Sequence, residues 1–182
     1  MKIYCDTSTL PHNIRYADQK SQLELAALKQ LAERYSMFGS HIVLYELMKT
    51  TAEIQRNNRI VDYKALEPIP KDEKLLGIRT QTDPVGGFVN CPIISDVQDD
   101  TVRDELIKRG LEQRDAEHIT QAVCNDCDVF LTRDEETIIK PHRPWLEKRF
   151  PNLKVLLPSE LLELIQAATG PIPTGPPSDF DH

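Results

Sequence analysis

Two acidic side chains follow apolar segments that read as buried strands. Asp6 ends the β-prone run 2–5 and is followed by three hydroxyl residues, and Asp134 comes shortly after the apolar run 128–132. Ligands and reacting groups gather at the carboxyl ends of parallel strands, so acids placed there are positioned for chemistry. An acid after a strand can also cap the next turn through its side chain, so this interpretation stays open.

Two further acids lie on predicted helices. Glu46 shares a helix face with Val43, Leu47 and Thr50, and a carboxylate on an apolar face needs a partner. An ion pair or an exposed rim position would also explain it. Asp115 falls in a first helical turn, where the helix dipole favours the charged form, so we expect it to be ionised at neutral pH. It could equally be a capping acid.

The order of elements predicts how these acids are brought together. Strands alternate with helices, which indicates an α/β fold, a three-layer α/β/α sandwich on a central, mainly parallel sheet. The predicted strands are 2–5, 35–38, 128–132 and 153–157. The predicted helices are 19–34, 40–55 with its continuation 56–66, 101–109, 111–123, 144–150 and 159–168.

Residues 11–16 are predicted to form a loop, and two further segments also lack helical or strand periodicity. Residues 77–100 contain Asp-Pro and Gly-Gly turn signals and are predicted to form a loop insertion. The Pro- and Gly-rich residues 169–182 are predicted to form a flexible tail after a single domain at 1–168.

Composition narrows the possible functions. The 182 residues carry a formal net charge of -7 and 40% hydrophobic content, which suits one core and argues against a broad basic surface for nucleic acid. No apolar stretch is long enough to span a membrane, and Met1 runs directly into a strand, so we expect a cytoplasmic protein. The four cysteines are expected to be reduced thiols.

Four carboxylates converging on one edge of the sheet would repel one another unless a cation lay between them. Ligation by carboxylate oxygens suits Mg²⁺ or Mn²⁺ better than zinc. The sequence therefore predicts a divalent metal site made by Asp6, Glu46, Asp115 and Asp134.

The motifs around these acids resemble the PIN domain ribonucleases. The segments that carry the resemblance are Asp6-Thr7-Ser8, Ser40 with Val43-Leu44-Tyr45-Glu46-Leu47, Asp115-Ala116-Glu117-His118-Ile119-Thr120-Gln121-Ala122, Phe130-Leu131-Thr132-Arg133-Asp134 and Pro158-Ser159-Glu160-Leu161-Leu162. They occur in the family's order over about residues 1–165. One such motif is weak, but four in order at plausible spacing are fairly specific.

The resemblance implies a metal-dependent endoribonuclease that hydrolyses single-stranded RNA. Asp6, Asp115 and Asp134 would hold one or two metal ions, and Glu46 would ligate a second ion or orient the attacking water. Because water attacks, the products should carry a 5′-phosphate and a 3′-hydroxyl. Thr132 would hydrogen-bond to an acid or the phosphate, and Arg133 would contact substrate.

Many small bacterial PIN proteins are toxins of toxin–antitoxin pairs, and such proteins often dimerise. The resemblance therefore implies an antitoxin partner and a homodimer as candidates.

Other residues near the acids have simpler interpretations. Lys49, Arg56 and Arg59 extend the Glu46 helix and could form a basic lip, although a solvated face explains the two arginines better. We expect His118 to be a hydrogen-bonded histidine at a helix surface, with a role beside Asp115 as the alternative. The Cys124–Cys127 spacing is expected to mark thiols at a helix end, since no second ligand pair lies nearby. Asp126 or Asp128 could replace one of the chosen acids.

Three other classes fit less well. A haloacid-dehalogenase-like phosphatase needs a second Asp two residues after the first, where this chain has Ser8. A receiver domain needs an acidic pair and a late Lys that we cannot place. A catalytically silent PIN-like module that binds RNA or protein is the main alternative, and it is disfavoured because all four acid positions are filled.

Overall fold

The computed structural model describes residues 1–10, 18–49, 57, 60, 61, 64, 66–68 and 99–169 of the chain. The elements in chain order are β1 (Ile3–Cys5), η1 (Thr7–Thr9), α1 (Gln19–Ala32), β2 (Met37–Gly39), α2 (His41–Met48), β3 (Glu67–Pro68), α4 (Asp100–Lys108), α5 (Gln113–Cys124), β4 (Val129–Leu131), η3 (Glu135–Ile139), α6 (Lys140–Arg149), β5 (Lys154–Leu156) and α7 (Pro158–Thr169). Within η1 the helix is of the 3₁₀ type, and η3 is a π-helix.

The strands form one parallel sheet in the order β3-β2-β1-β4-β5. β1 is central and pairs with β4 so that Cys5 lies opposite Leu131. Parallel strands end at the same edge, so the residues after β1 and after β4 emerge side by side. The predicted α/β architecture on a parallel sheet is confirmed.

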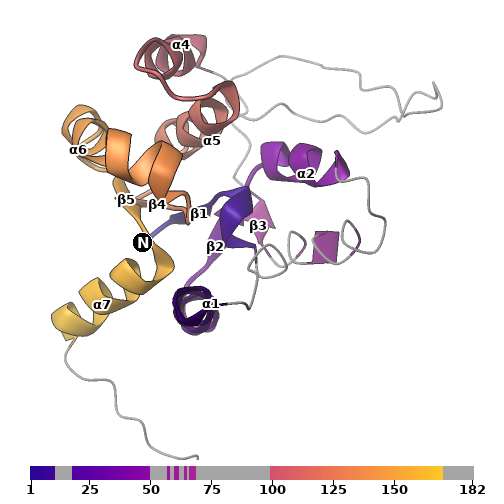
Figure 1. Cartoon of the computed structure of the whole chain (residues 1–182), viewed down its shortest axis with the longest axis vertical. Helices are drawn as coiled ribbons and strands as arrows, with labels where there is room; N and C mark the ends of the chain where they lie inside the picture. The colour runs from indigo at the N-terminus through magenta and orange to yellow at the C-terminus, as the bar shows by residue number, and fades with distance from the viewer. Residues whose placement is uncertain are drawn as a thin grey trace, which may run out of the picture.

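Helices cover both faces of this sheet (Figure 1). Successive strand residues point to opposite faces. Tyr4 and Phe130 pack into a core with α4, α5 and α6. Ile3, Cys5 and Leu131 pack into a second core with α1 and α7. The two separate cores make β1 and β4 apolar throughout, which is why their sequences read as continuous hydrophobic runs.

A buried acid joins the two helices of the second core. Glu24 of α1 is only 3% exposed, and its carboxylate accepts hydrogen bonds from Ser159 N at 3.0 Å and Ser159 Oγ at 2.6 Å. The first N–H groups of a helix have no partner within the helix. Glu24 therefore satisfies the beginning of α7 from outside it, and this fixes where α7 sits on the sheet.

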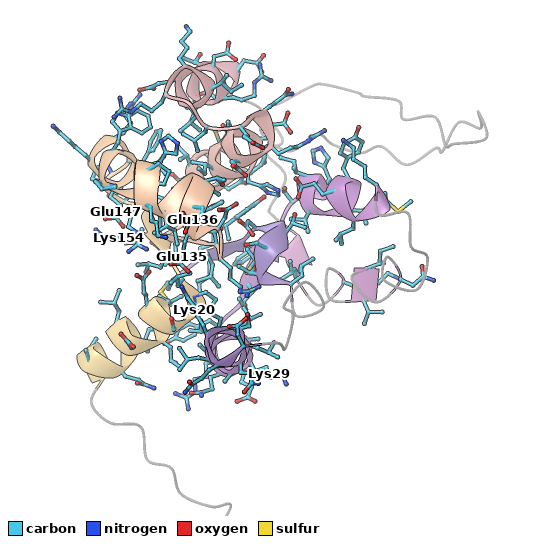
Figure 2. The ribbon with its side chains drawn as sticks, in the orientation of Figure 1. Lys20, Lys29, Glu135, Glu136, Glu147 and Lys154 are labelled. Atoms are coloured by element: carbon cyan, nitrogen blue, oxygen red, sulfur yellow. The ribbon has the colours of Figure 1, made fainter. Side chains whose placement is uncertain are left out.

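An ion pair connects α1 to η3, the helix that follows β4. Lys20, near the start of α1, pairs with Glu135 of η3. Figure 2 shows the two side chains approaching each other from these elements. Glu135 follows Asp134 directly, so this pair helps to hold the segment after β4 against the sheet edge.

The structure differs from the sequence prediction at three elements. The helix predicted over 40–55 ends at Met48, with Lys49 as its C-cap. Glu67–Pro68 forms the edge strand β3, which we did not predict. Two residues are too few to show a periodic pattern. Proline lacks an N–H, but an edge strand tolerates it. α6 begins at Lys140, not at the predicted Pro144, which lies inside the helix. Here the preceding π-helix leads into α6 without a break, and Pro144 removes one backbone bond near its beginning.

Several predictions fall outside the described residues. These are the loop 11–16, most of the continuation 56–66, nearly all of the insertion 77–100, and the tail from residue 170. Within the described part of the chain, no helix has the length and apolar character needed to cross a bilayer.

The Glu24 contact gives a stability prediction. Glu24→Ala leaves Ser159 N and Oγ at the start of α7 without their acceptor, and we expect it to lower the free energy of unfolding by about 1–3 kcal/mol. Glu24→Gln keeps one acceptor and should cost less. Urea denaturation measures both, with Glu163→Ala on the exposed face of α7 as the control. A Glu24→Ala protein as stable as this control would show that Glu24 does not anchor α7.

Candidate functional site

Asp6 occupies the end of the central strand. Its backbone N–H donates to Leu131 O at 3.1 Å, so the sheet continues up to this residue. Asp6 Oδ1 accepts from Ser8 N at 2.5 Å, and this bond caps η1. The residue is 6% exposed, and burial raises the pKa of its carboxyl, opposed by His118 and by hydrogen bonds from Ser8 and Thr132. The capping interpretation is therefore correct, and it leaves the carboxylate at the sheet edge.

Thr132 connects Asp6 to Asp134. Its side chain is fully buried, and Oγ1 donates to Asp6 Oδ2 at 2.5 Å. The same oxygen accepts from Asp134 N at 3.0 Å. The Thr132 hydroxyl thus donates a hydrogen bond to the Asp6 carboxylate and accepts one from the backbone N–H of Asp134. We predicted a supporting hydrogen bond for Thr132, and the structure gives it this one.

Asp134 is half-buried and caps the π-helix η3. Its Oδ1 accepts from Thr137 N at 2.9 Å. Thr137 also contacts α5, because its Oγ1 donates a hydrogen bond to Asp115 Oδ2 at 3.4 Å. Thr137 therefore bonds to both acids and bridges Asp134 and Asp115.

Asp115 lies in the first turn of α5, as predicted. Burial raises the pKa of Asp115 to about 6, and the negative charges of Asp134 and Asp6 add to this effect. We expected the helix N-terminus to favour the charged form. Asp115 is still mainly ionised at neutral pH, but the pKa shift has the opposite direction, because like charges and lost hydration outweigh the dipole.

Glu46 projects from α2 toward the same loop. Its Oε2 accepts from Thr7 Oγ1 and lies 3.2 Å from His118 Nε2. Burial raises the pKa of Glu46, but His118, the hydrogen bond from Thr7 and the charge of Arg114 outweigh burial and leave the pKa below its usual value. Glu46 is therefore an ionised acceptor that points inward, next to the residue that follows Asp6.

His118 is buried, contrary to our expectation of a surface position. It is 3% exposed, and its Nδ1 lies 2.7 Å from Tyr4 Oη. Because Glu46 Oε2 can only accept, Nε2 carries a proton and donates to it, and Nδ1 shares a second hydrogen bond with Tyr4 Oη. Tyr4 Oη also shares a hydrogen bond with Ser40 Oγ at 2.8 Å, and Ser40 is the N-cap of α2. This Ser40–Tyr4–His118–Glu46 chain begins and ends on α2.

A sequence signal for this chain exists but is weak. A tyrosine in a fully buried strand usually finds a hydrogen-bond partner for its hydroxyl, and His118 is one helical turn after Asp115. Sequence alone did not show that Tyr4 and His118 meet.

Arg133 lies beside the site but faces α1. Its backbone N donates to Ser8 Oγ at 2.8 Å. Its guanidinium donates to Ser8 O at 3.4 Å and to Ser21 Oγ at 3.2 Å. These contacts join η1, α1 and the end of β4, so Arg133 braces the loop that carries Asp6. Substrate contact by Arg133 stays a prediction.

Asp126 and Asp128 do not join the site. Both are exposed and precede β4, and Asp128 N donates to Lys2 O at 2.9 Å. They therefore lie at the amino edge of the sheet, opposite the carboxyl edge that carries Asp6. Lys49 is exposed at the end of α2, whereas Arg56 and Arg59 lie outside the described residues.

The cysteines of the described residues are free thiols: Cys5, Cys124 and Cys127. Burial raises the pKa of Cys127 to about 12 and also raises the pKa of Cys124. Thiols in this state are poor nucleophiles and poor metal ligands.

The four acids have donor atoms that suit a hard divalent ion. Asp6 and Asp134 raise the pKa of Asp115, which is the repulsion that a cation between them would relieve. Within the part of the chain that the structure describes, however, no three His, Cys, Asp or Glu side chains are grouped closely enough to hold a metal. The donor chemistry fits Mg²⁺ or Mn²⁺, and binding would require the carboxylates to move closer together.

The comparisons with known proteins find similarity among solved structures. No protein-family model matches the chain, and no curated protein matches it. Among solved structures, a chain of VapBC2 from Rickettsia felis, crystallised with a DNA fragment from its promoter, is similar at 20% sequence identity with a TM-score of 0.49. The match covers 86% of this chain and 98% of that chain.

The raised pKa of Asp115 predicts a pH-dependent stability difference in metal-free buffer. The folded pKa is about 6 and the ordinary value is 3.8, so the folded state binds more protons between them and loses stability as pH rises through this window. At pH 7.5, Asp115→Asn should be more stable than the parent by about 1 kcal/mol, allowing for partial exposure. Below pH 4 the difference should vanish. Urea denaturation in EDTA at several pH values measures this, and a pH-independent difference would contradict it.

The contact between His118 and Glu46 predicts energetic coupling. We expect a double-mutant cycle of His118→Phe and Glu46→Gln to give a coupling free energy of about 1 kcal/mol or more. Pairing His118→Phe with Glu33→Gln, an exposed acid after α1, should give additive changes in the free energy of unfolding. Equal coupling in both cycles would show that the buried contact has no specific energetic role.

Proposed function

We propose that this chain is a PIN-like, Mg²⁺- or Mn²⁺-dependent endoribonuclease that hydrolyses phosphodiester bonds of single-stranded RNA. The observation that carries the proposal is a string of contacts that joins all four acids at the carboxyl edge of the sheet. Thr137 links Asp115 to Asp134, and Thr132 links Asp134 to Asp6. Thr7, next to Asp6, donates to Glu46.

In this proposal Asp6, Asp115 and Asp134 would hold the divalent ion. When bound, the ion supplies positive charge at the scissile phosphate. The acids come from the ends of two strands and the first turn of a helix, so each is positioned by a different rigid element. Their shared negative charge gives the edge its preference for a cation.

Glu46 has a different role in the proposal. Its lowered pKa keeps it ionised, so it can accept a hydrogen bond from the attacking water and orient it. His118 and Thr7 hold its carboxylate through the contacts described above. Water attacks the phosphorus, the bond to the 3′-oxygen breaks, and that oxygen leaves as the 3′-hydroxyl, so the products are a 5′-phosphate and a 3′-hydroxyl.

The sequence resemblance extends the proposal to partners. A toxin role with a cognate antitoxin, and a homodimeric state, belong to the same proposal and rest on the resemblance alone. A short neighbouring reading frame that encodes a DNA-binding protein would support the toxin role.

A catalytically silent PIN-like module that binds RNA or protein is the second candidate. One observation favours it: among the described residues, no three carboxylate, histidine or cysteine side chains lie close enough together to hold a metal ion. Titration of Mn²⁺ by calorimetry separates the two, because a silent scaffold should bind no Mn²⁺ that is lost on changing Asp6→Asn with Asp134→Asn.

The nuclease proposal predicts the following result. Purified protein with a labelled single-stranded RNA should cleave it in Mg²⁺ or Mn²⁺ and leave 5′-phosphate ends. Asp6→Asn should lower the cleavage rate by about 100-fold or more, because it removes one of the proposed metal-holding charges. Asp126→Asn makes the same charge change at the opposite edge of the sheet and should leave the rate unchanged. Undiminished cleavage by Asp6→Asn would remove Asp6 from the mechanism.

A further inference from the structure

An exposed aromatic ring lies between two cations beside the acidic edge. Tyr45 of α2 is 43% exposed. The Lys49 Nζ lies 4.5 Å from the centre of its ring, and the Arg114 Cζ of α5 lies 4.6 Å from it. We call these three residues, Tyr45, Lys49 and Arg114, the aromatic lip.

The aromatic lip adjoins the acids on both helices that supply it. Tyr45 directly precedes Glu46, and Arg114 directly precedes Asp115. The charge of Arg114 also contributes to the lowered pKa of Glu46, so the guanidinium lies within electrostatic reach of that carboxylate. The lip is thus a border of the site and not a separate surface.

The cations of the lip are available for a new partner. Lys49 is exposed and makes no ion pair with any residue that the structure describes. Arg114 pairs with Glu117 at 2.5 Å, one turn along its own helix, and is partly exposed. Long charged side chains can lie on an apolar surface and still move their charged ends. Lys49 can therefore move onto a phosphate at a small cost, whereas Arg114 would exchange its partly buried contact with Glu117 for the phosphate.

A different cation–aromatic pair shows the contrast. Arg149 lies 5.0 Å from the ring of Phe150, and its guanidinium donates to both carboxylate oxygens of Glu105 at 2.8 and 2.9 Å. This arginine is fully engaged within the fold and borders none of the four acids. It serves as an internal control for the lip.

We propose that Tyr45, Lys49 and Arg114 form a binding subsite for single-stranded nucleic acid, which rests on the proposed ribonuclease function. Lys49 and Arg114 move onto the backbone phosphates and uncover the Tyr45 ring, on which one base stacks. Stacking on an aromatic ring together with cationic phosphate contacts is how proteins hold single strands without reading sequence. A chain with a net charge of -7 needs such a local positive border to bring phosphates to its acidic edge.

The test measures RNA binding without cleavage. Full-length protein in EDTA is titrated against a fluorescein-labelled, single-stranded adenine-rich RNA of about 12 nucleotides, with anisotropy as the readout, a length within the usual site sizes. Lys49→Gln and Arg114→Gln should each weaken binding several-fold at low salt. Each should also reduce the slope of log affinity against log salt by about 0.7, the value for one lost phosphate contact on a single strand.

The ring has its own signature. Tyr45→Leu should weaken binding by about 5- to 10-fold with an unchanged salt slope, because stacking releases no counterions. Tyr45→Phe should restore most of the affinity, since it keeps the ring. Arg149→Gln makes the same charge change as Arg114→Gln and should bind like the parent. Thermal unfolding of each variant separates lost binding from lost folding.

Several results would overturn the subsite. These are equal losses for Arg149→Gln and Arg114→Gln, parent-like binding by folded Tyr45→Leu, or duplex RNA that competes as well as the single strand. The nuclease proposal fails separately. Binding with the predicted signature but no cleavage in Mg²⁺ or Mn²⁺ would retain the subsite and support a silent RNA-binding module, whereas cleavage with no lip dependence would retain only the nuclease.

Discussion

Repulsion between like charges at one sheet edge is the constraint that shapes this structure. Burial and the negative charges of Asp134 and Asp6 together raise the free energy of the ionised form of Asp115, as its elevated pKa shows. Neutral hydroxyl groups hold them in place: Thr132 between Asp6 and Asp134, and Thr137 between Asp134 and Asp115. A lysine in these positions would neutralise the acids within the fold. Threonine leaves the negative charge uncompensated, which is what a cation-binding site requires.

This arrangement depends on the register between the two central strands. Cys5 pairs with Leu131, so Asp6 and Thr132 leave the sheet at the same level. A slip of one residue would turn Thr132 to the opposite face and break its bond to Asp6. The two cores prevent such a slip, because side chains on both faces of β1 and β4 are buried against helices. The site geometry is therefore maintained by apolar packing rather than by contacts among the acids.

The fourth acid is held by a different device. Glu46 comes from α2, which contacts η1 and α5. Its carboxylate is fixed by Thr7 and by His118. His118 is held by Tyr4, whose hydroxyl also bonds to Ser40. Tyr4 also stacks on Phe130, with ring centroids 5.6 Å apart. A polar chain thus runs from the α2 cap through the core to the site, so packing around β1 also determines where Glu46 points.

Local pattern was enough to predict the parallel α/β fold and the ends of β1 and β4, because alternating helix and strand signals and apolar runs are properties of neighbouring residues. It also placed Asp115 in a first turn. It missed β3, which is two residues long, and it placed the start of α6 at Pro144.

The buried position of His118, the direction of the Asp115 pKa shift and the exclusion of Asp126 and Asp128 were decided by tertiary structure. Each depends on residues that are far apart in the chain. Thr132 and Asp6, for example, are separated by 126 positions in the sequence. Composition and periodicity carry no information about which distant side chains meet, because burial and charge proximity arise only when the strands pair and the helices pack. The sequence therefore determined the elements and the acids, and only the folded chain determined how those acids are held and which of them share one edge.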